Sequence, residues 1–110
     1  MVLEIAALRV RDGDQGAFEL AFEKARRLLP GIDGYESHEL RRSLDEGRDY
    51  VLLTEWRSLE NATLGFRKSR EFARWHELLA SFVEAVPDIT YFGADISRQR
   101  AIARGDGTID

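Results

Sequence analysis

The spacing of hydrophobic residues switches between strand-like and helix-like several times along the chain. Residues 2–10 carry apolar side chains on both alternating faces, which predicts a strand with little exposed surface. From Phe18 to Leu29 the apolar residues recur at helical spacing, until Pro30 and Gly31 end the pattern. The first third of the chain is therefore expected to form a strand followed by a helix.

The remaining pattern predicts a hairpin, a broken helix and a last strand. Residues 35–42 and 49–56 alternate at strand spacing on either side of a polar turn. Ser58 is a good N-cap for a short helix over residues 59–66, and Ser69 for a longer helix that runs to Val86, before Pro87. Residues 88–92 are rich in strand formers.

The order of these elements, β-α-β-β-α-β, is typical of one α+β architecture. In the ferredoxin-like fold, a four-stranded antiparallel sheet carries both helices on one face. The strands hold more apolar residues than one buried face needs, so we expect the other face to pack against a second copy, giving a homodimer. Residues 1–94 would form this domain, with residues 95–110 as a polar tail that is mobile or exchanged with the partner protomer.

Composition removes several classes of function. The chain has 110 residues, which suits one domain, and its net charge of −4 and dispersed basic residues argue against nucleic acid as a partner. It has no cysteine, which excludes disulfides, thiolate metal sites and a cysteine nucleophile. No apolar run approaches the ~18 residues of a membrane span, and the N-terminus lacks the basic region of a secretory signal. We therefore expect a cytoplasmic protein without a membrane partner.

His76 is the most conspicuous candidate for chemistry. It shares a helical stripe with Phe72, Trp75 and Leu79, which predicts that it points inward. An inward histidine is either a packed core residue or the polar group of a pocket, and the pattern leaves both open. With His38 as the only other histidine, the two are too few and too poorly spaced for a zinc site, so no metal is expected.

Three segments in order resemble the antibiotic biosynthesis monooxygenase family. They are the Pro-Gly and Gly-Tyr pairs of residues 29–35, the strand and Glu-Trp pair of residues 50–58, and Ser-x-x-Phe-x-x-Trp at residues 69–75. The resemblance spans residues 2–93. It implies a dimeric α+β barrel with a small ligand in each protomer's cleft between helices and sheet. The family's activities include cofactor-free oxygenation of polycyclic phenols, heme degradation and isomerisation of small signalling molecules.

The heme-degrading branch of that family offers one comparison. It resembles this chain in placing a histidine ten residues after an aromatic, here His76 after Phe66. In that branch the histidine binds the iron, the aromatic is a tryptophan and the first strand supplies an asparagine. Here Phe66 lacks the indole and residues 4–7 contain no asparagine, which argues against efficient heme cleavage.

Cofactor-independent oxygenation of a small aromatic or phenolic substrate by molecular oxygen requires fewer specific residues than heme degradation does. It needs aromatic walls, a base and a group that stabilises an oxyanion. His76 or His38 could transfer the proton, and Asn61 or Arg67 could contact the oxyanion. The candidate walls are aromatic residues of the strands and the broken helix: Trp56, Phe66, Phe72, Trp75 and Tyr91.

Each of these residues also has a purely structural interpretation. The aromatics lie at core spacing, Asn61 could complete a helical turn after Ser58, Arg67 could be a surface charge, and His38 could be inert on its strand. A dimeric ligand-binding protein without catalysis therefore stays open as an alternative.

Overall fold

The sheet is built around strand β1 (Val2–Arg9) in the computed structural model, which describes residues 1–97. β1 pairs antiparallel with β3 (Asp49–Trp56) on one side and with β4 (Asp88–Phe92) on the other. β2 (Tyr35–Arg42) pairs with β3, so the strand order is β2-β3-β1-β4. This arrangement confirms the predicted ferredoxin-like α+β fold.

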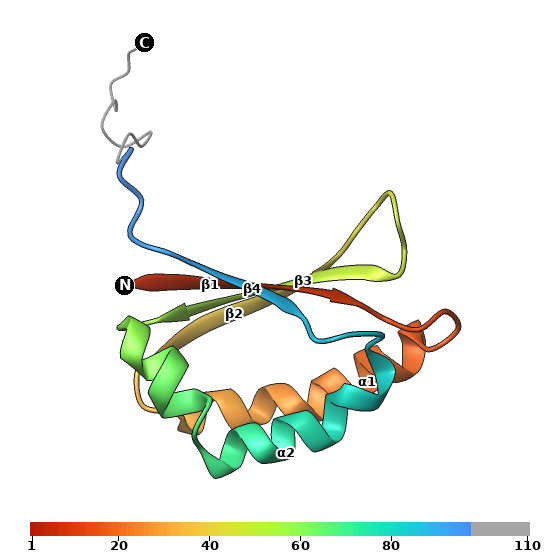
Figure 1. Ribbon diagram of the computed structural model, residues 1–110, viewed down its shortest axis with the longest axis horizontal. Helices are drawn as coiled ribbons and strands as arrows, with labels where there is room; N and C mark the ends of the chain where they lie inside the picture. Colours follow the sequence, from red (N-terminus) through yellow and green to blue (C-terminus); the bar gives the residue numbers. More distant parts are fainter. Residues whose placement is uncertain (98–110) are drawn as a thin grey trace.

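The helical elements cover one face of this sheet (Figure 1). α1 (Gln15–Ala25) continues into the 3-10 segment η1 (Arg26–Gly31). The predicted broken helix is a π-helix, η2 (Asn61–Phe66), followed by α2 (Arg70–Leu79) and the 3-10 turn η3 (Ala80–Phe82). As predicted, Ser69 caps α2: its Oγ accepts a hydrogen bond from the Phe72 backbone N–H at 3.0 Å.

The prediction that the second helix runs to Val86 is wrong. The chain leaves helical geometry at Val83, which forms an antiparallel bridge to Val10. The backbone N–H of Glu84 then donates to the carbonyl of Arg9 at 2.9 Å. Pairing with the end of β1 therefore competes successfully with the helical pattern, and residues 83–87 become a non-helical connection to β4.

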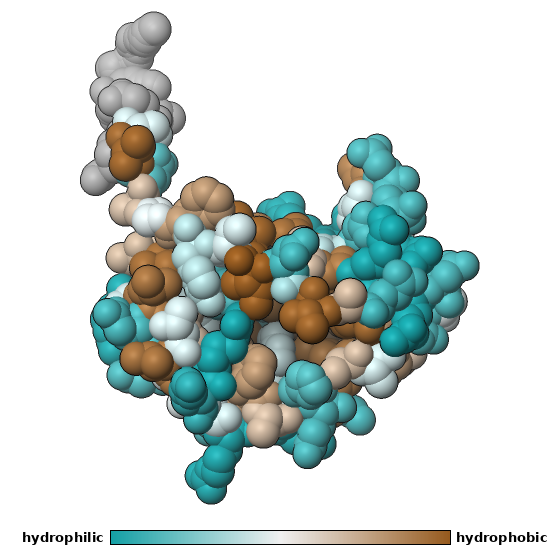
Figure 2. Space-filling model, in the orientation of Figure 1, coloured by the Kyte–Doolittle hydropathy of each residue, from teal (hydrophilic) through white to brown (hydrophobic). Residues whose placement is uncertain are grey.

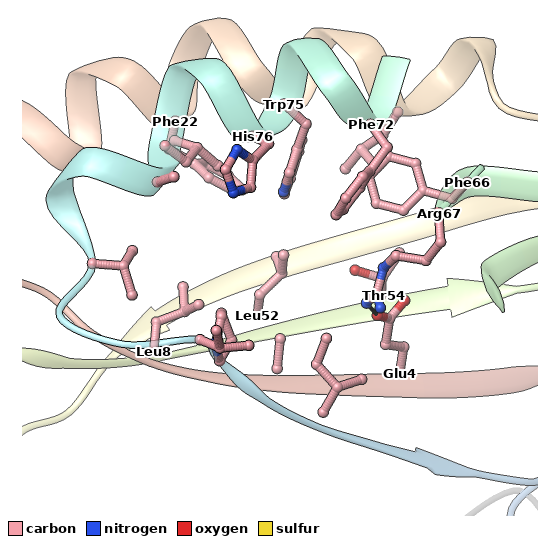
Figure 3. A pocket seen from close by; sticks show the side chains of 18 of the residues that line it. Glu4, Leu8, Phe22, Leu52, Thr54, Phe66, Arg67, Phe72, Trp75 and His76 are labelled. Carbon is pink, nitrogen blue, oxygen red and sulfur yellow. Dashed lines mark hydrogen bonds and ion pairs between the residues drawn. The ribbon is translucent and has the colours of Figure 1, made fainter. Parts of the chain in front are cut away.

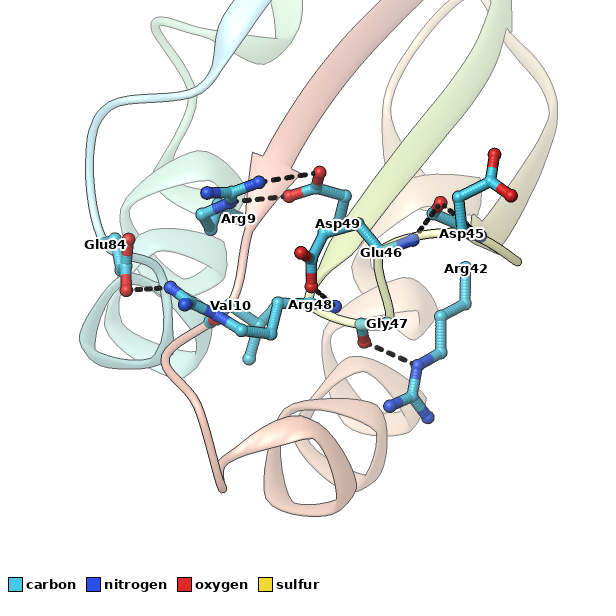
Figure 4. Close-up of polar contacts among 10 residues, drawn as sticks. Arg9, Val10, Arg42, Asp45, Glu46, Gly47, Arg48, Asp49 and Glu84 are labelled. Carbon is cyan, nitrogen blue, oxygen red and sulfur yellow. Dashed lines mark hydrogen bonds and ion pairs between the residues drawn. The ribbon is translucent and has the colours of Figure 1, made fainter.

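Polar contacts hold this connection beside the hairpin turn (Figure 4). Arg48, in the turn between β2 and β3, forms an ion pair with Glu84, and its Nε donates to the carbonyl of Val10 at 3.2 Å. Arg9 forms a two-pronged pair with Asp49 at 2.7 and 2.9 Å, which lowers the pKa of the Asp49 carboxyl. Segments distant in sequence are thus fixed together at one end of the sheet.

Side chains of β3 alternate strictly between the two faces of the sheet. Tyr50, Leu52, Thr54 and Trp56 are buried on the face toward the helices, whereas Val51 and Leu53 on the other face are only partly covered. Together with Leu3 and Ile5 of β1, these partly covered residues make the centre of that face apolar. No helix of residues 1–97 covers it (Figure 1).

The homodimer and the role of the tail stay predictions. The uncovered face supports a sheet-to-sheet dimer, although the structure describes a single chain. Of the predicted tail, residues 98–110 lie outside the described residues. Among residues 1–97, no helix is long and apolar enough to cross a membrane.

The dimer is tested by replacing Leu53 with Arg. Leu53 faces away from the helices, so dimerisation would bury the new charge and weaken association by several kcal/mol, on the order of the cost of an unpaired buried ion. At micromolar concentration, light scattering should give a dimer for the wild type and a monomer for Leu53→Arg. Leu20→Arg is the matched control, because Leu20 is 73% exposed on α1. A monomeric wild type would contradict the predicted sheet-to-sheet dimer.

Candidate active site

A cavity of about 390 Å³ lies between α2 and the sheet. Its floor consists of small and aliphatic side chains from the strands: Ala6, Leu8, Leu52 and Ile89. Its roof includes Phe66, Phe72 and Trp75, which point down from the helical layer (Figure 3). Hydrophobic side chains gather around a hollow on the face shown in Figure 2. The cavity therefore suits a largely apolar, planar ligand.

A buried carboxylate lies at one end of the cavity. Glu4 is 5% exposed and faces the helices because its neighbours Leu3 and Ile5 take the opposite face of β1. Its Oε1 accepts a hydrogen bond from the indole Nε1 of Trp56 at 2.8 Å. Its Oε2 forms an ion pair with the Nη2 of Arg67. Both carboxylate oxygens are thus engaged, as a buried charge requires.

The π-helix brings Arg67 to this carboxylate. The backbone N–H of Arg67 donates to the carbonyl of Ala62, five residues earlier, at 3.2 Å. The guanidinium carbon lies 5.4 Å from the centroid of the Phe72 ring. The Nε of Arg67 is buried and meets no hydrogen-bond acceptor among the described residues. Arg67 is therefore a wall of the cavity rather than a solvated surface charge.

Aromatic rings pack edge to face along the roof. Phe66 lies 5.2 Å from Phe72 and 5.6 Å from Trp75, centroid to centroid, at interplanar angles of 89° and 85°. Trp56 is fully buried behind Phe66, with the centroids 5.4 Å apart, and does not line the cavity. Such packing fixes the ring positions before any ligand binds.

His76 borders the cavity but is exposed to solvent. Its ring lies 6.5 Å from that of Phe72, and no hydrogen bond to either ring nitrogen occurs within residues 1–97. The interpretation of His76 as a packed core residue is therefore wrong. Its neighbour Trp75 occupies the centre of the buried stripe, and one step along a helix turns His76 by about 100° toward the rim.

Three other predicted site residues lie outside the cavity. His38 accepts or donates a 2.7 Å hydrogen bond with the Tyr35 hydroxyl, in a separate hollow that also contains Arg26. Tyr91 lies beside Glu4 in the β1–β4 register; burial, and then the charge of Glu4, raises the pKa of its hydroxyl. Neither residue lines the cavity: Tyr91 is a neighbour of its polar end, and His38 belongs to the separate hollow.

Asn61 is the third of these residues. Its Oδ1 accepts a hydrogen bond from the Ser58 hydroxyl at 2.8 Å, at the start of the π-helix. Its side chain also lies against Gly34, where an added Cβ would come within 2.2 Å of the Asn61 Cγ. Asn61 thus closes a contact between the π-helix and the loop before β2, and it does not line the cavity.

Two polar residues that line the cavity were missed by the sequence interpretation. Glu4 interrupts an otherwise apolar strand, which was a usable signal for a buried polar site. Thr54 is 3% exposed, lines the cavity and lies opposite Glu4 in the β1–β3 register. Nothing local in the sequence marks Thr54, because its importance comes from a partner fifty residues away.

Comparison with known proteins assigns the family. The model of the antibiotic biosynthesis monooxygenase family matches residues 1–78, and the chain belongs to this family. A relative from Bacillus subtilis (strain 168), the uncharacterized protein YczJ, is 39% identical over 92 residues, covering 84% of this chain and 97% of the relative.

Solved structures agree with this assignment. A Bordetella bronchiseptica protein, provisionally assigned as an antibiotic biosynthesis monooxygenase, has a TM-score of 0.83 at 26% identity, covering 86% of this chain and 97% of that one. SnoaB of Streptomyces nogalater, a cofactor-independent oxygenase, has a TM-score of 0.73 at 20% identity, with 90% and 97% covered. The likeness to SnoaB concerns the fold alone.

Replacing Gly34 with Ala tests the structural role of Asn61. Gly34 has φ +87°, and its added Cβ would collide with Asn61. We expect a loss of about 2–5 kcal/mol in the free energy of unfolding, from about 1–2 for the left-handed backbone and about 1–3 for the clash. Gly13→Ala is the control, because its φ is +92° and no atom lies within 4 Å of the added Cβ. Equal losses in denaturant unfolding would contradict the contact.

His38 should make stability depend on pH. Burial, and then the charge of Arg26, lowers the pKa of His38, with Glu23 opposing the shift. The unfolded chain therefore binds a proton more readily, so this contribution is complete above the unfolded pKa of about 6.5 and is lost as pH falls below it. Comparing melting temperatures at pH 7.5 and 5.5, His38→Gln should show a smaller decrease than the wild type. If the melting temperature of His38→Gln falls as much as that of the wild type between these pH values, His38 is not the source of the pH dependence.

Proposed function

We propose that this protein is a monooxygenase that oxygenates a small planar aromatic or phenolic substrate without a cofactor. The observation that carries the proposal is the cavity itself. It has apolar walls and aromatic roof residues, with a paired arginine at one end and a solvent-accessible histidine at its rim. An electron-rich substrate can supply all the electrons that oxygen accepts.

The reaction begins with loss of a proton from the bound substrate. The resulting anion passes one electron to molecular oxygen, and the radical pair recombines to a peroxide. For a methylene carbon of an anthrone, the peroxide then loses water and leaves a carbonyl. One oxygen atom enters the product and the other leaves as water, so four electrons pass from substrate to oxygen and no external reductant is needed.

Each step has a candidate residue in the cavity. His76 takes the proton, and its exposure lets the proton pass on to solvent. The guanidinium of Arg67 stabilises negative charge that develops on a substrate oxygen. Phe66, Phe72 and Trp75 exclude water from the anion and hold the ring system flat.

One comparison supports leaving a cofactor out of this proposal. SnoaB, which has this fold, is a cofactor-independent oxygenase, so the fold can carry such chemistry. Heme degradation is the less favoured alternative, since β1 presents Ala6 and the already paired Glu4 to the cavity, and Phe66 stands where the heme branch has tryptophan.

His76→Gln tests the proposed base. The variant keeps a hydrogen-bonding group of similar size but cannot titrate near neutral pH. Oxygen uptake with a panel of anthrones and dihydroxynaphthalenes, without added flavin or metal, should fall about 10²–10⁴-fold, the usual contribution of a positioned proton-transfer group. The melting temperature should stay near that of the wild type because His76 is exposed. His38→Gln is the matched control and should retain turnover.

Other outcomes would separate the alternatives. Full turnover in His76→Gln would exclude His76 as the base. A second outcome is that compounds of the panel quench the tryptophan fluorescence of the wild type saturably, but none of them causes oxygen uptake. That outcome would indicate a ligand-binding protein. A stoichiometric spectral change on titration with heme, lost in His76→Gln, would favour the heme alternative.

A further inference from the structure

The polar end of the cavity holds hydrogen-bonding groups that the protein itself leaves unused. The hydroxyl of Thr54 makes no hydrogen bond among the described residues, although the side chain is 3% exposed and lines the cavity. The Nε of Arg67, beside it at the same end (Figure 3), is buried without an acceptor. A buried polar group is normally paired, so the unpaired Nε of Arg67, next to the cavity-lining hydroxyl of Thr54, indicates a missing partner.

The charges at this end are already balanced. Glu4 and Arg67 neutralise each other, and the indole of Trp56 fills the second carboxylate oxygen of Glu4. A ligand carboxylate placed here would have to approach Glu4, a like charge buried in the same small space. A neutral oxygen meets no such repulsion, and it can accept from Arg67 and exchange a hydrogen bond with Thr54.

We propose that Thr54 and Arg67 anchor a neutral oxygen substituent, a carbonyl or a phenolic hydroxyl, of a planar ligand, and that Glu4 excludes carboxylates from the cavity. This inference rests on the proposed function, because it assigns the substrate class of the same cavity. The ligand's ring system lies beneath Phe66 and Trp75, toward His76. The substrate class is therefore uncharged hydroxylated polycyclic ketones and phenols, rather than aromatic acids.

Two unreactive probes test the anchor without turnover. Both 1,8-dihydroxyanthraquinone and anthraquinone-2-carboxylate are fully oxidised at the central ring, and binding is measured under nitrogen by tryptophan fluorescence quenching. The wild type should bind the dihydroxy compound at least tenfold more tightly than the carboxylate. Thr54→Val keeps the side-chain shape but lacks the hydroxyl, and should lose about 3–10-fold affinity for the dihydroxy compound, as expected for one neutral hydrogen bond. Thr90→Val, on the opposite face of the sheet, should lose none.

Glu4→Gln tests the exclusion of carboxylates. Glutamine keeps one acceptor oxygen, for either Trp56 or Arg67, and places an NH2 group at the other position, while the cavity gains a net positive charge. The affinity for anthraquinone-2-carboxylate should rise at least tenfold, with little change for the dihydroxy compound. A melting curve checks the fold of this variant. If Glu4→Gln does not fold, the wild-type preference and Thr54→Val decide the question.

The outcomes distinguish the anchor from the proposed function. Equal wild-type affinities for the two probes, or unchanged affinity in Thr54→Val, would overturn the anchor even if the enzyme consumes oxygen. The predicted binding pattern without oxygen uptake on any anthrone would support the anchor and overturn the oxygenase proposal instead.

Discussion

The carboxylate of Glu4 is the group on which the arrangement of this protein's cavity depends. A charge buried in the middle of an apolar strand is tolerated only if it is paired and hydrogen-bonded. Glu4 meets this requirement by binding Trp56, at the end of β3, and Arg67, at the end of the π-helix. One interaction thus joins three parts of the chain that are distant in sequence, and it places the polar end of the cavity at their meeting point.

The π-helix makes this meeting possible. Its wider turn carries Phe66 and Arg67 to the inner side of the helical layer, so that one covers Trp56 and the other reaches Glu4. Ser69 then starts α2 with a new cap, and α2 follows its own course above the sheet. The interruption thus divides the roof of the cavity between Phe66, which also covers Trp56, and the residues of α2. Wide helical turns of this kind recur at functional sites because they displace side chains in this way.

The fold could be predicted because its signals are local. Alternation in β3, the stops at Pro30 and Gly31 and the Ser69 cap each act within a few residues, and together they define the order of the elements. The end of the second helix could not be predicted, because it depends on the pairing of Val83 with Val10 across the molecule. His76 shows a finer limit. A stripe of apolar residues identifies the buried side of a helix. It does not show whether a residue at the edge of the stripe, such as His76, lies in the core or at the rim of the cavity.

The candidate site was predicted in part for the same reason. Phe66, Phe72, Trp75 and Arg67 lie in one continuous segment, and proximity in sequence was enough to group them. Thr54 and Glu4 become neighbours only through the register of β1 and β3, which no local pattern encodes. Asn61 suited an oxyanion role by residue type, yet its amide oxygen accepts from Ser58 and its side chain packs on Gly34, away from the cavity. Whether a polar side chain serves structure or chemistry therefore depends on what its hydrogen-bonding groups already bind. The Thr54 hydroxyl and the Arg67 Nε have no partner among the described residues, so both are available to a ligand.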